Sequence, residues 1–270
     1  MRRIALLVVM VLMLLPVYFM FTGSLQDING VFAMPPQVIP RGVTGMNYAW
    51  ILSLPVARWA LNTVLLIAFG VALSVSVVTM AAYAFAFYRF PLKRALWLLL
   101  LAGIMVPRIA LVIPQFVVIS KLGISGTLAA VILPAALFPI GIYLARTYFQ
   151  TVPMSLIESA RMDGASEFQI LTRVVAPVSR PIITTLVLFT TTFSLGDYLW
   201  QMLQLQREGR QTLLVGLMRA SMVAGARSDM AVNPIGHSLA VGAVLLIPLL
   251  VVFFSASRYF TSALGGAVKG

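Results

Sequence analysis

Long apolar blocks recur along the chain, separated by polar segments. As a helix, each block would be about as long as the hydrocarbon core of a bilayer is thick. About 20 apolar residues in a helix span the hydrocarbon core, whereas the strands of a membrane barrel are shorter and alternate apolar with polar residues. Hydrophobic residues make up 61% of the 270 residues and charged residues only 10%, too few to cover the surface of a soluble domain. The sequence therefore predicts an all-α integral membrane protein.

Six membrane-spanning helices fit these blocks, in a single transmembrane domain that covers residues 1–270. The third span carries Pro107 and Pro114, so we expect it to be kinked or partly unwound. The first span follows Arg2 and Arg3 and has no small-residue cleavage pattern at its end, so we expect it to be retained. The expected spans are residues 4–24, 60–87, 95–119, 127–149, 181–204 and 236–256.

The positions of the cations predict the orientation of the spans. Arg89, Lys93 and Arg94 share one tight connection, and short loops rich in Lys and Arg stay in the cytoplasm. This orientation puts both termini in the cytoplasm, together with residues 150–178. The segment 26–58 then lies outside, and we expect it to be mostly irregular, with a short helix near Tyr48.

Several functional classes are disfavoured by composition. The net charge of +12 comes from cations scattered between apolar blocks, so membrane topology explains it better than a nucleic-acid partner does. The chain has no cysteine and a single histidine, His237, so we expect no metal site and no disulfide. With few acids as well, a catalytic constellation in a membrane-embedded enzyme is hard to assemble.

A polar island over residues 150–178 separates the fourth and fifth expected spans. It holds Glu158, Asp163 and Glu167, three of the chain's seven acids. Charged residues of this density between two apolar blocks remain in water. A connector at the membrane interface and a docking surface for a soluble partner both fit such a segment.

Local patterns in this island predict a short helical hairpin. Pro153 suits the first turn of a helix, and Gly164 after Asp163 suits the left-handed residue that ends one. Ser166 and Gln169 have the spacing of a capping box, which begins a second helix. We expect Phe168, Leu171 and Val174-Val175 to share one face of that helix, which ends at Pro177.

The same segment resembles the EAA motif of permease subunits in ATP-binding-cassette importers. That motif is Glu-Ala-Ala, three residues, Gly, nine residues, then Ile-x-Leu-Pro, and the spacing here agrees throughout. Ser159 stands for Ala, Val174 for Ile and Ala176 for Leu. The matching residues are Glu158-Ser159-Ala160, Gly164 and Val174-Val175-Ala176-Pro177.

Other stretches resemble the carbohydrate branch of these importers, in particular its second, maltose-type permease subunit. The resemblance runs from about residue 45 to the C-terminus. It implies a protein of the bacterial cytoplasmic (inner) membrane. The similar stretches are Ala60-Leu61-Asn62-Thr63, Ala81-Ala82-Tyr83-Ala84-Phe85-Ala86, Arg89-Phe90-Pro91 and Gly266-Ala267-Val268-Lys269-Gly270.

This resemblance implies the partners of the chain. They are a sister permease in a heterodimer, two copies of a cytoplasmic ATPase, an extracytoplasmic solute-binding protein and the surrounding lipid. The hairpin would be a coupling helix in a groove of the ATPase. Glu158 and Arg161 would then be surface contacts, Gly164 would set the corner, and Asp163 would cap or pair locally.

No nucleotide site is expected in this chain itself. A phosphate-cradling loop needs Gly-x-x-x-x-Gly-Lys-Ser/Thr. The lysines are Lys93, Lys121 and Lys269, and none has that context. We therefore expect no cofactor and no enzymatic activity here, with ATP and Mg²⁺ bound by the ATPase subunits.

Ionisable residues within the expected spans are candidates for the substrate path. Arg108 and Asp197 lie at a common depth, roughly 20–24 Å from the cytoplasmic ends of their spans, so we expect them to face a cavity and to pair. Snorkelling to the outer interface is the alternative for either residue. Tyr198, Trp200 and Gln201 combine flat faces with polar groups, as a sugar site requires, and the alternative for the aromatics is a lipid-facing or interfacial position. Asn62 and the threonines 190–192 either line the path or join helices.

The solute stays open between several classes. The permease family often has Trp-Asn just before the Asp-Tyr position, and this chain has Leu195-Gly196 instead. A sugar or sugar-like solute is the first expectation, and a glycerophosphodiester or a polyamine is the alternative. An ion-coupled secondary transporter would show two related halves with broken helices, which the sequence lacks.

Overall fold

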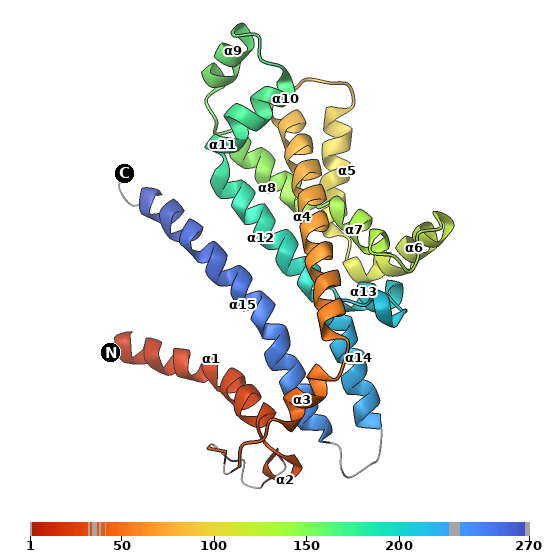
Figure 1. Cartoon of the computed structure of the whole chain (residues 1–270). Coiled ribbons are helices and arrows are strands. Elements are labelled where there is room, and N and C mark those ends of the chain that lie inside the picture. Colours follow the sequence, from red (N-terminus) through yellow and green to blue (C-terminus); the bar gives the residue numbers. More distant parts are fainter. Residues whose placement is uncertain are drawn as a thin grey trace. The chain divides into compact units, whose positions relative to one another are not determined.

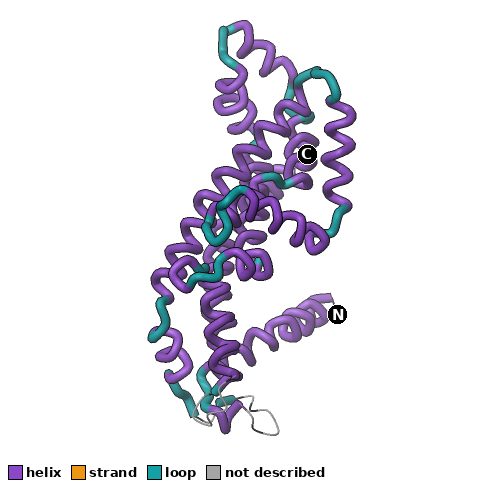
Figure 2. Tube along the Cα trace, turned by 90° about the vertical axis from the view of Figure 1, so that its right-hand side faces the viewer, coloured by secondary structure: helices purple, strands orange, loops and turns teal. Residues whose placement is uncertain are grey.

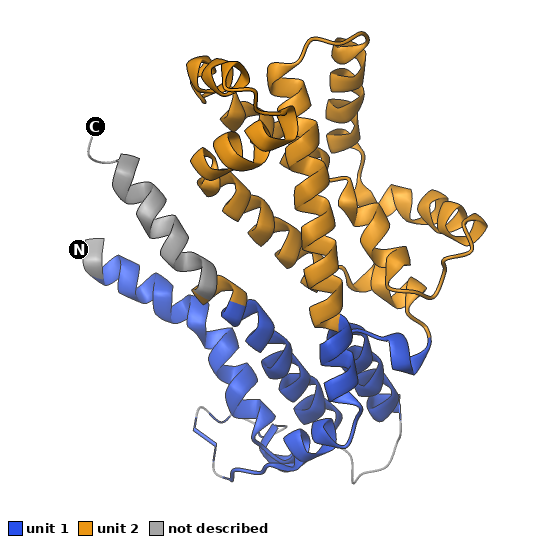
Figure 3. Cartoon of the chain, turned by 45° about the horizontal axis from the view of Figure 1, so that its top comes forward, with its two compact units in different colours: residues 1–62, 207–251 blue, residues 63–206, 252–270 orange. Residues whose placement is uncertain are grey.

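The computed structural model describes residues 2–31, 33, 37, 39–40, 42–226 and 233–267. All regular structure in these ranges is helical (Figure 2). The chain divides into two compact units (Figure 3): unit 1 is residues 1–62 and 207–251, and unit 2 is residues 63–206 and 252–270. Val268, Lys269 and Gly270, which belong to the last of the permease-like stretches above, lie outside the described residues.

Unit 1 is built around the indole of Trp59. Trp59 packs with Ile51, Leu217 and Val241 in one apolar cluster, and a Cβ at Gly216 would overlap its ring. The short helix expected near Tyr48 is present as α3. The unit contains α1 (Arg2–Ser24), α2 (Ile28–Val31), α3 (Met46–Leu52), the first turns of α4 (Val56–Phe87), η2 (Glu208–Arg210), α14 (Leu213–Ala226) and the first half of α15 (Pro234–Ala267) (Figure 1).

Three stretches of helix are long and apolar enough to cross a membrane unbroken: 4–24, 56–87 and 234–254. Three further helix pairs pass the same test when each bent pair is taken as one span, which gives up to six. The number agrees with the prediction. The side chains of α1 from Ile4 to Leu15 are exposed, as expected where acyl chains surround a helix.

Two of the bends lie where a residue precedes a proline, a position that disfavours helix. Val106 is extended before Pro107, and the pair of α5 (Lys93–Met105) and α6 (Arg108–Lys121) is bent by 111° from a straight line. Phe138 precedes Pro139, and the pair of α7 (Ala129–Ala136) and α8 (Pro139–Phe149) is bent by 42° from a straight line. The expected break in the third span is therefore present at Pro107, while Pro114 lies inside α6.

The third bend joins the polar segment to the fifth span. Residues 167–178 meet α12 (Arg180–Gly196) at 90°. The span expected over 181–204 is also interrupted, because α12 ends at Gly196 and α13 (Tyr198–Gln204) begins after Asp197. This interruption places Asp197 at a helix boundary instead of in a continuous span.

The core of unit 2 lies where α4, α8 and α12 meet the polar segment. Val78 and Ala82 from α4 are in one cluster with Phe149 from α8 and Ile157 from the polar segment, all nearly inaccessible to solvent. A second cluster surrounds Trp200 of α13. Unit 2 therefore fixes both candidate sites described below.

Candidate functional site

The polar segment folds as the predicted helical hairpin, referred to below as the hairpin (residues 154–178). Its first helix, α9 (Met154–Met162), follows Pro153, which lies one position before the first turn. Gly164 has φ +77°, and the N–H groups of Gly164 and Ala165 donate to the carbonyls of Arg161 and Ala160. These two bonds form a Schellman motif, which satisfies carbonyls at the helix end.

The second helix begins with the predicted capping box. The Gln169 N–H donates to Ser166 Oγ at 3.4 Å, and the Ser166 N–H donates to Gln169 Oε1 at 2.8 Å. The helix continues from α10 (Glu167–Ile170) through a π-helical turn (Leu171–Val175) into α11 (Ala176–Val178). Local hydrogen bonding therefore fixes both ends of the corner.

One side of the hairpin is buried against the spans. Ile157, Ile170 and Val175 are completely buried in the same cluster as α4 and α8. Phe168 was expected to share a face with Leu171 and Val175, but it is 66% exposed while both of those residues are buried, and Ile170 takes the inward position. The Ser159 hydroxyl donates to the Ser155 carbonyl at 2.8 Å within its own helix.

The opposite side of the hairpin exposes large apolar side chains next to charges. Met162 is 83% exposed and Leu156 is 41% exposed. Glu158 and Asp163 are exposed as well, and Asp163 is the C-cap residue of α9. Of the remaining motif residues, Ala160 is half-buried against the core and Pro177 is exposed. Exposed apolar groups in this density are typical of a surface that binds a partner.

Arg161 is engaged inside the hairpin. Its Nε donates to Glu167 Oε1 at 2.8 Å, across the glycine corner. Tyr83 of α4 donates its hydroxyl to Glu167 Oε2 at 2.6 Å. These hydrogen bonds, from Arg161 first and then from Tyr83, lower the pKa of the Glu167 carboxyl to about 2.

Sequence reasoning did not single out Tyr83 or give Glu167 a role. The opposite charges of Arg161 and Glu167, on either side of a glycine stop, carry a signal for their ion pair. Tyr83 lies 84 positions before Glu167, and no local pattern connects them.

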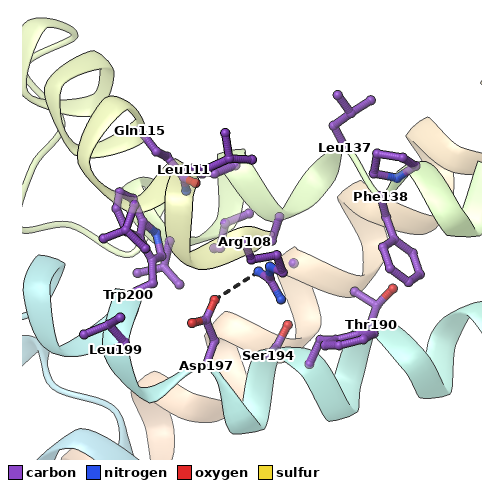
Figure 4. A pocket seen from close by; sticks show the side chains of 18 of the residues that line it. Arg108, Leu111, Gln115, Leu137, Phe138, Thr190, Ser194, Asp197, Leu199 and Trp200 are labelled. Carbon is purple, nitrogen blue, oxygen red and sulfur yellow. Dashed lines mark hydrogen bonds and ion pairs between the residues drawn. The ribbon is translucent and has the colours of Figure 1, made fainter. Parts of the chain in front are cut away.

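The second candidate site is a cavity of about 630 Å³ within unit 2 (Figure 4). Arg108 Nη2 lies 3.2 Å from Asp197 Oδ2, which joins the start of α6 to the break between α12 and α13. The Arg108 guanidinium also lies 5.7 Å from the centre of the Phe193 ring. A cation at a helix N-terminus is disfavoured by the helix dipole, so the Asp197 carboxylate offsets an unfavourable position.

The predicted path residues divide into two groups. Arg108, Asp197 and Trp200 line the cavity, and the Trp200 indole is anchored by a 3.1 Å hydrogen bond to the Ala130 carbonyl. Thr190 lines the cavity too, which is the first of the two roles expected for it, lining the path or joining helices. The lining also contains Gln115, Phe193 and Ser194, which the sequence did not indicate.

Asn62, Tyr198 and Gln201 do not belong to this lining in the part of the chain that the structure describes. The Asn62 amide donates to the carbonyls of Gly209 at 3.2 Å and Gln211 at 2.8 Å, so it holds a loop of unit 1. Gln201 is buried and donates to the Ser194 carbonyl at 2.6 Å.

Residues 78–265 match the model of one protein family. The matching family is described as "Binding-protein-dependent transport system inner membrane component". The hairpin and every residue of the cavity lining from Gly103 onward lie inside this range.

Individual relatives cover nearly the whole chain. The arabinooligosaccharides transport system permease protein AraQ of Bacillus subtilis is 27% identical over 96% of this chain and 92% of its own length. The sn-glycerol-3-phosphate transport system permease protein UgpE of Rhizobium meliloti is 26% identical over 97% of this chain and 94% of its own length.

A solved structure has the same fold. It belongs to a bacterial ABC transporter involved in the import of the acidic polysaccharide alginate, with a TM-score of 0.84. The match covers 96% of this chain and 95% of that chain at 24% identity. The all-helical arrangement with about six spans, bent pairs included, is therefore the fold of that transporter chain.

Proposed function

Because this chain belongs to the family of binding-protein-dependent transport system inner membrane components, we propose that it forms, with a sister permease, the path by which a sugar or sugar-like solute enters the cell. The chain is the permease of a bacterial ABC importer, a multi-pass protein of the inner membrane that is not itself an enzyme and has no cofactor of its own. A complex of this kind includes an ATPase and a binding protein.

The exposed face of the hairpin is the observation that carries the coupling role. Met162, Phe168 and Glu158 are exposed, while Ile157 and Ile170 attach the hairpin to the spans. An apolar patch rimmed by charge suits a groove in a soluble subunit. Because the inner side is packed against α4 and α8, a push on the outer side reaches the spans.

The proposed arrangement of subunits follows from this role. One ATPase copy binds this hairpin and a second copy binds the equivalent segment of the sister permease. Both termini and the hairpin then lie in the cytoplasm, and the solute-binding protein delivers its cargo from outside. Arg89, in the connection after α4, and Lys93 and Arg94, which begin α5, support this orientation.

The cavity in unit 2 is the proposed section of the solute path. Trp200 offers an aromatic face, and Thr190, Ser194 and Gln115 offer polar atoms along a largely apolar wall. Sugars present both hydroxyl groups and apolar C–H faces, so this mixture suits them. The Arg108–Asp197 pair is neutral as a whole, which favours an uncharged solute over a phosphorylated one.

Glycerol phosphate is the alternative cargo, because it is named for one of the relatives and Arg108 keeps 67% of its side chain exposed. Uptake assays separate the two classes. Proteoliposomes with the complete importer take up labelled arabino-oligosaccharide or labelled glycerol 3-phosphate, and competition by the other compound identifies the cargo. Uptake of neither would remove both from consideration.

Capture of the ATPase tests the coupling role. The tagged full-length chain is purified in detergent from its own host, and bound proteins are identified by mass spectrometry. We expect a partner that carries Gly-x-x-x-x-Gly-Lys-Ser/Thr, and we expect a Met162→Asp, Phe168→Asp double variant to lose it. Leu52→Asp, at a 79% exposed residue of α3, is the matched control and keeps the partner. Retention of the ATPase by the double variant would contradict the proposed docking face.

A further inference from the structure

One carboxylate joins three helices in unit 2. Glu167 is the first residue of α10, and its Oε2 accepts the Tyr83 hydroxyl of α4 at 2.6 Å. Its Oε1 accepts Arg161 Nε of α9 at 2.8 Å, and Arg161 Nη2 lies 3.4 Å from Oε2. Hydrogen bonds to an ionised carboxylate are short, strong and directional.

The donor from α4 is held in a fixed direction. The Tyr83 side chain is 4% exposed, and its ring packs against Phe87 and Tyr88 with centroids 5.2 Å and 5.9 Å away. The Tyr83 hydroxyl therefore points at Glu167 without freedom to follow a hairpin that moves independently.

Tyr88, the residue after the end of α4, also interacts with Glu167, and the other contacts that the described residues of α4 make in this cluster are apolar. Ala82 packs in the same cluster as Ile157 and Val175. Burial of apolar surface holds two bodies together but is non-directional, so it permits sliding. The chain itself connects the hairpin to α8 and α12 but not to α4. A directional link to α4 therefore has to come from side chains.

We infer that Glu167 is a positioning residue for transport: with Tyr83 and Arg161 it locks the hairpin to α4, so that movement imposed by the ATPase is passed to this span. The inference rests on the proposed coupling function of the hairpin. The lock keeps the hairpin and the inner end of α4 as one rigid body while the importer changes state.

The first test measures solute moved per ATP hydrolysed. Tyr83→Phe removes only the hydroxyl, and Glu167→Gln removes only the charge; both are assembled with the ATPase and sister permease in proteoliposomes. We expect the ratio to fall by about three- to tenfold, with ATPase capture unchanged. Tyr143→Phe, a 41% exposed tyrosine of α8, is the matched control and keeps the wild-type ratio.

The second test reads the link directly. The chain has no cysteine, so spin labels can be placed on Ser155→Cys in the hairpin and Met80→Cys in α4. The distance distribution is expected to be single in the otherwise native chain and to broaden in Tyr83→Phe. A purely structural role would lower thermal stability without this broadening.

The outcomes separate the inference from the proposed function. Loss of ATPase capture by the native chain would overturn the coupling function itself. Intact capture with a wild-type transport ratio and an unchanged distance distribution, in both Tyr83→Phe and Glu167→Gln, would overturn only the lock. If one of the two variants fails to fold, the other decides.

Discussion

Arg108 and Asp197, 89 positions apart in the sequence, meet at 3.2 Å where two interrupted helices face one cavity. Neither residue lies within a continuous helix. Arg108 begins α6 after the break at Pro107, and Asp197 separates α12 from α13. The pair therefore joins two places where helices are interrupted.

Neutralising this pair is expected to impair transport more than stability. Arg108 and Asp197 have side chains 67% and 24% exposed, so Arg108→Ala or Asp197→Asn costs at most about 1 kcal/mol of folding free energy. We expect uptake to fall by roughly tenfold in either variant, equivalent to about 1.4 kcal/mol. The swap Arg108→Asp with Asp197→Arg should recover part of it. If both single variants lose uptake and the charge swap recovers none of it, the pairing has no functional support.

Position 164 is expected to accept only residues that readily adopt the left-handed backbone conformation of Gly164. A Cβ there meets no atom within 4 Å, but φ is +77°, which costs an ordinary L-residue about 1–2 kcal/mol. Gly164→Val should insert in the membrane and lose transport, because the corner of the hairpin is displaced. Gly164→Asn is the control, since asparagine adopts this conformation more readily. Normal uptake by the valine variant would remove the hairpin geometry from the mechanism.

Gly216 is expected to be sensitive for a different reason, which is space. The Trp59 ring lies against it, and the indole N–H is anchored to the Glu208 carbonyl at 3.0 Å, so the ring has no room to move aside. Gly216→Ala should lower stability by about 1–3 kcal/mol despite the better helix propensity of alanine. Thermal unfolding in detergent measures this, with Gly45→Ala as control because its Cβ would meet no atom within 4 Å. Equal melting temperatures for the two variants would contradict the packing argument.

The absence of cysteine in the sequence makes the proposed orientation directly measurable. Met162→Cys in the hairpin and Leu52→Cys in α3 each give one exposed thiol. A membrane-impermeant maleimide should label Leu52→Cys in cells whose outer barrier has been opened, and Met162→Cys only after the inner membrane is lysed. The reverse pattern would invert the topology.

Features with local chemistry were readable from the sequence. The capping box of Ser166 and the left-handed Gly164 depend on neighbours within a few residues, so the hairpin was predicted correctly. The break at Pro107 follows from the steric effect of proline on the residue before it. The orientation of Phe168 was not readable, because tertiary packing selected Ile170 as the buried residue.

Long-range contacts were readable only where charge and depth constrained them. Arg108 and Asp197 were expected to pair because two ionisable groups at one depth in a membrane need a partner. Asn62 has no such constraint, and its bonds to the carbonyls of Gly209 and Gln211 connect residues that no pattern relates. The same holds for Tyr83 and Glu167.

The sharp turn at Pro107 also bears on the length of the proposed solute path. α5 has 13 residues, so it rises only about 20 Å before α6 leaves at 111°, against roughly 30 Å for a hydrocarbon core. With α5 along the membrane normal in the proposed orientation, Arg108 would lie about 20 Å from the cytoplasmic end of its span. A permeation barrier that starts at Arg108 is then about one third thinner than the bilayer around it.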